Sequence, residues 1–142
     1  MAKETPQHDC LFNAGRRLSR LLSQAYERQL APSGLKATQF SLLAALATLG
    51  PEGASIARLA RALDLEASTF SRNLKPLTRD GLVILTRGED ARVRHVSLTA
   101  AGRARYEAAL PLWRKAQSHV REALGGKALT RLTKLVREAR AL

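Results

Sequence analysis

The sequence predicts a mainly α-helical fold with a minor β component, in which four helices precede a two-stranded hairpin and two helices follow it. Apolar residues recur every three or four positions through most of the chain, which is typical of amphipathic helices. The period changes to alternation in residues 82–87 and 93–98, which indicates strands. At 142 residues the chain has the length of one ordinary domain, so we expect a single domain over residues 1–142.

Two helices are predicted before residue 51. The first carries apolar residues from Leu11 to Leu30, spans about six turns, and ends near Ala31-Pro32-Ser33-Gly34. The second follows Thr38, whose side-chain oxygen is expected to accept a hydrogen bond from the first turn, and it ends at Gly50-Pro51.

A helix-turn-helix is predicted between residues 55 and 81. Ser55 is expected to cap its first helix, and the second begins near Ala67 after Asp64-Leu65-Glu66. The two helices can share one small core, made of Ile56, Leu59, Ala60, Leu63, Leu65, Phe70 and Leu74. Pro76 leaves the Arg72 carbonyl without its intrahelical donor, so we expect a bend there and no break.

The hairpin and two further helices complete the predicted order. The strands flank a polar turn at residues 88–92, and Thr99 is expected to cap a long helix over residues 100–124. Gly125-Gly126 ends that helix before a last one with apolar residues between 129 and 139. Pro111 predicts a second bend.

The second helix of the helix-turn-helix presents short polar and basic side chains opposite its apolar face. These are Ser68, Thr69, Ser71, Arg72 and Lys75. Short hydroxyls near a helix N-terminus can reach phosphates and base edges, and Arg72 can donate two hydrogen bonds to a guanine. Thr38 and Ser55, at the expected starts of their helices, are further candidate DNA contacts. An amphipathic helical hairpin without a DNA-binding role could present the same surface.

The basic hairpin that follows favours DNA binding, because this order of elements is that of a winged helix-turn-helix. Arg87, Arg92 and Arg94 lie on or beside the wing, and an arginine at its tip could enter a minor groove. Asp90 is expected to orient Arg92 through a local hydrogen bond, although turn acids more often bond to their own backbone.

The run from Leu35 to Gly102 resembles the MarR family of bacterial regulators. The similarity rests on Thr38-Gln39-Phe40, the helix-turn-helix, Asp80-Gly81-Leu82-Val83, the wing Asp90-Ala91-Arg92, and Leu98-Thr99-Ala100-Ala101-Gly102. The flanking helices match in order and length. The resemblance implies a recognition helix in the major groove, a wing in the minor groove, and repression as the usual mode of control. Glu66 stands where many relatives have aspartate as the cap, which is a mild departure.

A homodimer is expected on both the resemblance and the apolar pattern. Residues 35–102 would form the winged DNA-binding region, and residues 8–33 and 100–142 the interlocked dimerisation helices. A winged core of about 65 residues has too little surface to cover three more amphipathic helices, whereas a second subunit can. A monomeric packing of those helices is the alternative. Two-fold symmetry implies an inverted-repeat operator on double-stranded DNA.

The resemblance also implies a small-molecule effector, because relatives are often released from DNA by aromatic or phenolic ligands. Candidate lining residues are Phe12, Arg16, Tyr26, Phe40 and Trp113. Each of these aromatic residues has a purely structural alternative, as part of a core.

Cys10 is the only cysteine, which excludes an internal disulfide and a cysteine-rich zinc site within the chain. One branch of the family that the chain resembles senses organic peroxides through a cysteine near the start of the first helix. Aligned through Gln39, that cysteine falls on Phe12, one partner tyrosine on Tyr26 and the other on Ala37. Cys10 is therefore either an inert thiol or a redox sensor that could bond to another chain.

Composition limits the remaining function classes. Lys and Arg number 24 against 12 acids, giving a net charge of +12, which suits binding to a polyanion but could also reflect a solvated surface.

The sequence also lacks the patterns of several other classes. Without a signal core or an apolar span, we expect a cytoplasmic protein with no membrane partner. His8, His95 and His119 lie far apart, so no metal is expected. Without a phosphate loop, a serine elbow or an acid/base cluster, we expect neither a cofactor nor an enzyme.

Two rival classes remain open. A basic helical protein could coat DNA without sequence preference, and its binding would then depend on salt and little on sequence. Alternatively, the winged helix could be a protein-interaction module. Substitution of Arg92 tests these classes against the regulator, because it should weaken DNA binding if the wing reads a groove.

Overall fold

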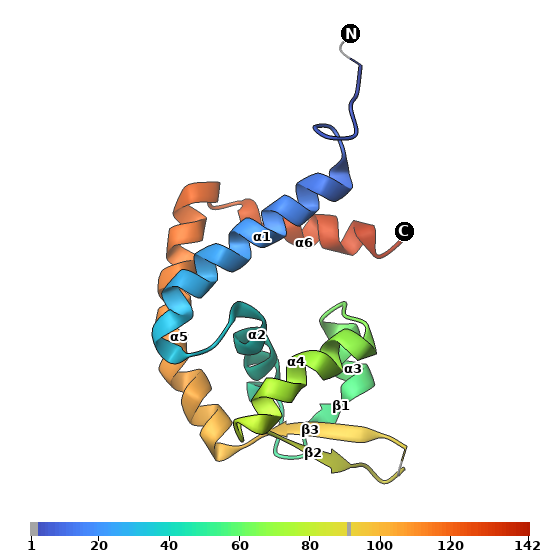
Figure 1. The fold of residues 1–142 in the computed structure, drawn as a ribbon, viewed down its shortest axis with the longest axis vertical. Helices are drawn as coiled ribbons and strands as arrows, with labels where there is room; N and C mark the ends of the chain where they lie inside the picture. The colour runs from blue at the N-terminus through green and yellow to red at the C-terminus, as the bar shows by residue number, and fades with distance from the viewer. Residues whose placement is uncertain (1–2, 91) are drawn as a thin grey trace. The chain divides into compact units, whose positions relative to one another are not determined.

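The computed structural model describes residues 3–90 and 92–142 and follows the predicted order of elements (Figure 1). Ala91, in the middle of the wing motif, lies outside the described residues. The elements are α1 (Leu11–Leu30), a 3-10 turn η1 (Ala31–Ser33), α2 (Ala37–Ala47), β1 (Ala54–Ser55), α3 (Ile56–Ala62), α4 (Ala67–Arg79), β2 (Val83–Arg87), β3 (Arg94–Leu98), α5 (Ala100–Leu124) and α6 (Ala128–Ala139). None of the described helices is both long and apolar enough to cross a membrane.

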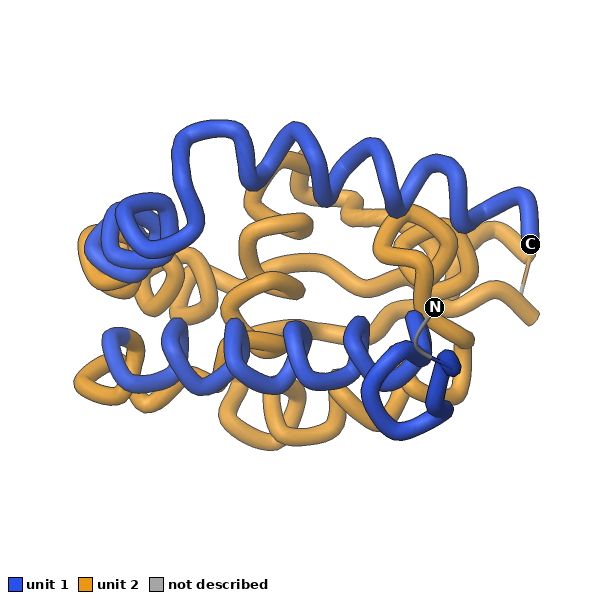
Figure 2. The backbone as a smooth tube through the Cα atoms, turned by 90° about the horizontal axis from the view of Figure 1, so that it is seen from above, with its two compact units in different colours: residues 1–29, 113–142 blue, residues 30–112 orange. Residues whose placement is uncertain are grey.

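The chain, expected as a single domain, divides into two compact units (Figure 2). Unit 1 contains the chain up to Gln29 together with Trp113–Leu142, and unit 2 contains Leu30–Leu112. Unit 1 therefore holds nearly all of α1, the second half of α5, and α6. Unit 2 holds the elements predicted for the winged region together with the first half of α5.

The sheet of unit 2 has three strands, in the order β1-β3-β2, with antiparallel pairing. The sequence predicted the hairpin of β2 and β3 but missed β1, where Ala54 pairs with Val96 and Ser55 with His95. Gly53 makes this pairing possible, because a Cβ atom there would lie 1.9 Å from the Val96 carbonyl oxygen. The sheet packs with the helices around buried side chains that include Leu42, Leu43, Phe70, Leu74, Leu77 and Val96.

Helix starts follow the sequence prediction at Ser55 and Thr99 but not at Thr38. The Ser55 hydroxyl accepts from the Arg58 N–H at 3.2 Å, and the Thr99 hydroxyl accepts from the Gly102 N–H at 3.0 Å. Thr38 does not cap α2, because the extended residue at the start is Lys36, whose N–H donates to Gln39 Oε1 at 2.9 Å. The predicted Thr38 cap is thus wrong: the chain turns into the helix two residues earlier.

The two internal prolines do not interrupt their helices. α4 continues through Pro76 and α5 continues through Pro111. The absence of a break is therefore confirmed, and the bends expected at the two prolines stay predictions.

Candidate nucleic-acid interface

Helix α4 has one face buried in unit 2 and the opposite face exposed. Phe70, Leu74 and Leu77 are at most 2 % exposed, and their spacing of four and three residues places them on a single face. Ser68, Ser71, Arg72 and Lys75 are exposed, and Thr69 is half-buried. The side chains predicted to contact DNA are therefore presented together on the free side of this helix.

A tight turn fixes α4 against α3. Asp64 adopts a left-handed conformation with φ of 54°, which aspartate tolerates better than most residues. The N–H of Leu65 then donates to the Ala60 carbonyl at 2.8 Å, and Ala60 itself is buried. Glu66 is the cap residue of α4, but its side chain makes no capping hydrogen bond. The turn is held by backbone bonds and close packing.

Arg72, the residue predicted to read a base, has a local partner. Its Nη2 atom donates to the Thr69 hydroxyl at 3.4 Å, across one turn of α4. This bond uses one of the five N–H donors of the guanidinium and leaves the others for an acceptor. The contact therefore limits the motion of Arg72 without preventing it from reading a base.

The wing concentrates positive charge. In the register of β2 and β3, Arg87 stands directly opposite Arg94, and both side chains are exposed. Like charges in directly opposed positions destabilise a strand pair in the absence of a counterion. A polyanion laid against the wing would remove that cost, so the pairing favours an anionic partner.

The turn of the wing is closed by backbone bonds and by Asp90. The Gly88 N–H donates to the Val93 carbonyl at 2.8 Å, and the Val93 N–H to the Asp90 carbonyl at 2.9 Å. Asp90 Oδ1 accepts from the backbone N–H of Arg92 at 3.0 Å. The expected local hydrogen bond between Asp90 and Arg92 is thus present, and it is made to the backbone N–H of Arg92, as is common for acids in turns. The Arg92 side chain itself is exposed.

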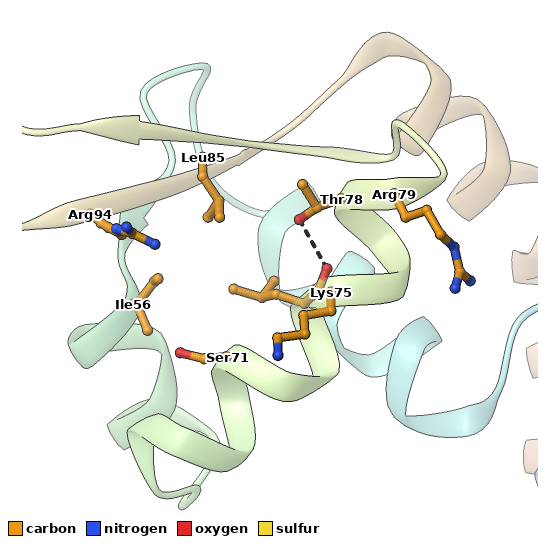
Figure 3. Close-up of a pocket in the computed structure, with 8 residues that line it drawn as sticks. Ile56, Ser71, Lys75, Thr78, Arg79, Leu85 and Arg94 are labelled. Atoms are coloured by element: carbon orange, nitrogen blue, oxygen red, sulfur yellow. Dashed lines mark hydrogen bonds between the residues drawn. The ribbon is translucent and has the colours of Figure 1, made fainter.

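A hollow of about 270 Å³ lies between α4 and the wing (Figure 3). Its lining residues are Ile56, Ser71, Leu74, Lys75, Thr78, Arg79, Leu85 and Arg94. Arg94 extends from β3, whereas Ser71 and Lys75 come from α4, so the hollow joins the two elements predicted to contact DNA. Sequence reasoning missed Ile56, Leu85 and Thr78 here, because only the fold brings the start of α3 and the first strand of the wing beside α4.

Thr38 and Ser55 occupy different settings from these residues. Thr38 lies on the first turn of α2 and is exposed. Ser55 is half-buried, and its hydroxyl already accepts the N–H of Arg58. That bond leaves only the hydroxyl proton of Ser55 to donate.

The candidate effector and sensor residues fall into both units. Cys10 is half-buried just before α1, and Phe12 is 68 % exposed, with the Arg16 guanidinium 5.6 Å from the centre of its ring. Trp113 is half-buried in unit 1. Phe40 lies in the core of unit 2, with its ring 5.5 Å from that of Tyr106. The position of Phe40 favours the core alternative for this residue.

Tyr26 is the candidate that lines a pocket. Its hydroxyl donates to Gln117 Oε1, from α1 to α5 within unit 1. Burial raises the pKa of the Tyr26 phenol above its ordinary value of 10.0, and the positive charge of Arg121 offsets part of that rise. The phenol therefore stays protonated at neutral pH.

The described residues contain no arrangement of His, Cys, Asp and Glu that could hold a metal ion. The chemistry that the site offers is instead that of hydrogen-bond donors and positive charge on a rigid scaffold, which suits phosphates and the edges of bases.

Comparison with known proteins gives consistent similarities. The model of the MarR family matches residues 33–92. An uncharacterised HTH-type transcriptional regulator of Bacillus subtilis, YwoH, is 36 % identical over 89 residues, which cover 63 % of this chain and 64 % of that protein. The crystal structure of the Mycobacterium tuberculosis transcriptional regulator MosR in complex with DNA is 40 % identical, with a TM-score of 0.84, and covers 93 % of this chain and 97 % of that chain. The transcriptional repressor CouR, bound to a 23-mer DNA duplex, is 25 % identical with a TM-score of 0.77 and covers 99 % of both chains.

Proposed function

Because the chain belongs to the MarR family, we propose that it is a transcriptional repressor that binds an inverted-repeat operator as a homodimer. Members of this family are DNA-binding transcription factors, and we propose that this chain likewise has no enzymatic activity. We further propose that its partner is double-stranded DNA and that it acts in the cytoplasm. Repression is proposed by analogy with CouR, which is a repressor bound to DNA.

One observation carries the DNA-binding proposal: unit 2 joins the exposed polar face of α4 to an arginine-bearing wing across a single hollow. Arg72 reads a base edge in the major groove. Ser68, Ser71 and Lys75 contact the DNA phosphates and so position α4 on the duplex. Arg92 enters the adjacent minor groove. In an A·T-rich tract this groove is narrow, and its electrostatic potential is most negative.

Exposed apolar side chains support the homodimer. Most of the exposed large hydrophobic residues in the described part of the chain lie in unit 1, among them Leu11, Phe12, Leu21, Leu129, Leu135 and Val136, whereas Ile84 and Val93 lie in unit 2. Leu11 is 90 % exposed and Leu135 is 60 % exposed, although each lies in an amphipathic helix. Exposed apolar side chains on amphipathic helices are typical of an interface, and a second copy of unit 1 would cover them.

Control by a small aromatic or phenolic ligand is the proposed means of release. Tyr26, on a pocket of unit 1, is the candidate that best supports it. Oxidation of Cys10 is the second candidate trigger, since the thiol is only partly buried. Operator binding by wild type and Cys10→Ser, with and without peroxide, separates the two triggers: only an effect that disappears in the variant belongs to the thiol.

Non-specific DNA coating is the rival that an observation favours, because the net charge of +12 would attract any duplex. Fluorescence anisotropy with a selected duplex and a scrambled duplex of equal length tests the proposal. A specific regulator should prefer the selected duplex by about a thousandfold or more. Arg92→Ala should weaken that binding by about 1–3 kcal/mol. Equal affinity for both duplexes would contradict the proposal, and an unchanged affinity of the variant would remove Arg92 from the mechanism.

A further inference from the structure

We propose that the basic face of α6, made of the cap residue Lys127 with Arg131 and Lys134, binds the phosphates of a DNA segment other than the operator. This helix belongs to unit 1. Unit 1 contains 13 Lys and Arg residues against 5 Asp and Glu, a net charge of +8 within the +12 of the whole chain. Most of the net positive charge therefore lies outside the unit that carries α4 and the wing.

The basic face and the apolar face of α6 lie on opposite sides of the helix. Lys127, Arg131 and Lys134 follow one another at intervals of four and three residues, which places them on one face. All three are exposed. The helical period places the apolar residues on the other side, and they include Leu129, Leu132 and Val136. A second copy of unit 1 that covered the apolar side would therefore leave the basic face open.

The charges of this face do not stabilise α6 itself. Lys127 and Arg131 are like charges four residues apart, and Arg131 and Lys134 are three apart, so both pairs destabilise the helix. The helix dipole also disfavours a cation at the start of a helix, and the first turn of α6 has no acid that would offset Lys127. Glu138 is the only acid of α6, and its Oε1 atom lies 4.0 Å from Lys134 Nζ. A partner that supplied negative charge would remove this repulsion.

A DNA duplex suits this face in charge and in length. Lys127 and Lys134 lie about 10 Å apart along the helix axis, at 1.5 Å for each residue. A duplex presents one negative charge for about each 1.7 Å of its axis, so the three side chains can reach several phosphates. Contacts to phosphates carry no sequence information. Because other DNA far outnumbers the operator in a genome, the segment that meets this face is one that unit 2 does not hold.

An anionic membrane is the other polyanion that a basic amphipathic helix can bind. Binding to a membrane requires the apolar side of the helix to enter the lipid. In the proposed homodimer a second copy covers that side, which leaves only the basic face and favours DNA. The joining of two DNA segments rests on the proposed binding of an operator by unit 2, whereas the binding of phosphates by α6 does not.

Capture of one duplex by another tests the proposal with the full-length protein. A biotinylated operator duplex on beads is saturated with protein and washed, and a dye-labelled scrambled duplex is added at about 0.1 M salt. Wild type should retain the labelled duplex, and retention should decrease steeply with salt. The triple variant Lys127→Gln, Arg131→Gln, Lys134→Gln should bind the labelled duplex at least about tenfold more weakly, because three phosphate contacts are lost. Its affinity for the operator should be unchanged.

A second triple variant, Arg17→Gln, Arg20→Gln, Arg28→Gln, is the matched control. It removes three exposed arginines of α1, so it loses the same charge from the same unit. It should retain the labelled duplex as wild type does. Circular dichroism of both variants verifies that they fold.

Three outcomes would overturn the proposal. They are no retention of the labelled duplex by wild type, equal loss of retention in the two triple variants, and tighter binding of wild type to phosphatidylserine vesicles than to the labelled duplex. Equal loss would mean that only net charge matters, and vesicle binding would assign the face to a membrane. Failure of the proposed function would appear separately, as equal affinities for the operator and the scrambled duplex. Any immobilised duplex could then replace the operator, and the comparison of the two variants would still test α6.

Discussion

Replacing Arg94 with glutamine should separate DNA affinity from fold stability. Arg94 stands opposite Arg87 in the wing, and both are exposed. Two unit charges about 6 Å apart in water repel by about 0.7 kcal/mol, and screening at about 0.15 M salt reduces this to about 0.3 kcal/mol. Removing one charge should therefore leave the free energy of unfolding in urea unchanged or slightly higher. The glutamine stem retains part of the packing in the hollow beside α4.

The same change should weaken operator binding. An arginine that binds a phosphate or a groove contributes about 1–3 kcal/mol, and a homodimer presents two copies of Arg94. The slope of log affinity against log salt becomes shallower by about 0.9 for each phosphate that the protein no longer neutralises, so a change of about 2 is expected for a dimer. Fluorescence anisotropy between about 0.1 and 0.3 M salt measures both quantities.

Arg137→Gln is the control for charge alone, because Arg137 lies on α6 in unit 1 and outside the candidate interface. It should leave the affinity within about 0.5 kcal/mol of wild type, as surface substitutions usually do. Equal effects of the two substitutions would refute the reasoning, because the wing would then act only through net charge. A decrease in the stability of Arg94→Gln that matched its decrease in affinity would also refute it.

Three further predictions concern stability. Gly102→Ala should destabilise unit 2 by about 1–3 kcal/mol in urea unfolding, because its Cβ would lie 1.9 Å from the Leu82 carbonyl oxygen. Gly15→Ala, whose Cβ would have nothing within 4 Å, should be neutral or stabilising. Equal losses of stability in the two variants would contradict the geometry. Thr99→Ala should lower the free energy of unfolding by about 1–2 kcal/mol, because the hydroxyl accepts from the Gly102 N–H at 3.0 Å and donates to the Gly81 carbonyl at 2.7 Å. An unchanged stability would show that this cap does not stabilise α5. Burial raises the pKa of Tyr26 above its unfolded value of 10.0, so above that pH the phenol ionises in the unfolded chain before it does so in the folded protein. Stability should therefore be unaffected below that pH and should fall above it. The fall should be smaller in Tyr26→Phe, and identical alkaline profiles would contradict this.

The helices and the hairpin could be predicted from the sequence because their apolar periods are long. The first helix was expected to begin at Leu11 and to end near Ala31-Pro32-Ser33-Gly34, and it spans Leu11–Leu30. β1 could not be predicted, since two residues carry no period and their pairing with β3 depends on Gly53. The start of α2 was missed because Thr38 is a good cap residue, whereas the bond that forms is from Lys36 N–H to Gln39 Oε1.

The candidate site was predicted less completely than the fold. Spacing alone placed the polar face of α4 correctly, because its buried and exposed sides alternate with the helical period. The opposition of Arg87 and Arg94 depends on the register of the hairpin, which the length of its turn sets and composition does not. The pocket around Tyr26 depends on packing between α1, α5 and α6, so its members Gln117 and Arg121 carried no signal in the sequence.

Selection of preferred duplexes from a random pool at about 0.15 M salt tests the central claim most directly. A homodimeric, sequence-specific regulator should enrich an inverted repeat whose half-sites lie about one helical turn apart. Recovery of no motif, with salt-sensitive binding to every duplex, would contradict the account and favour a protein that coats DNA without sequence preference.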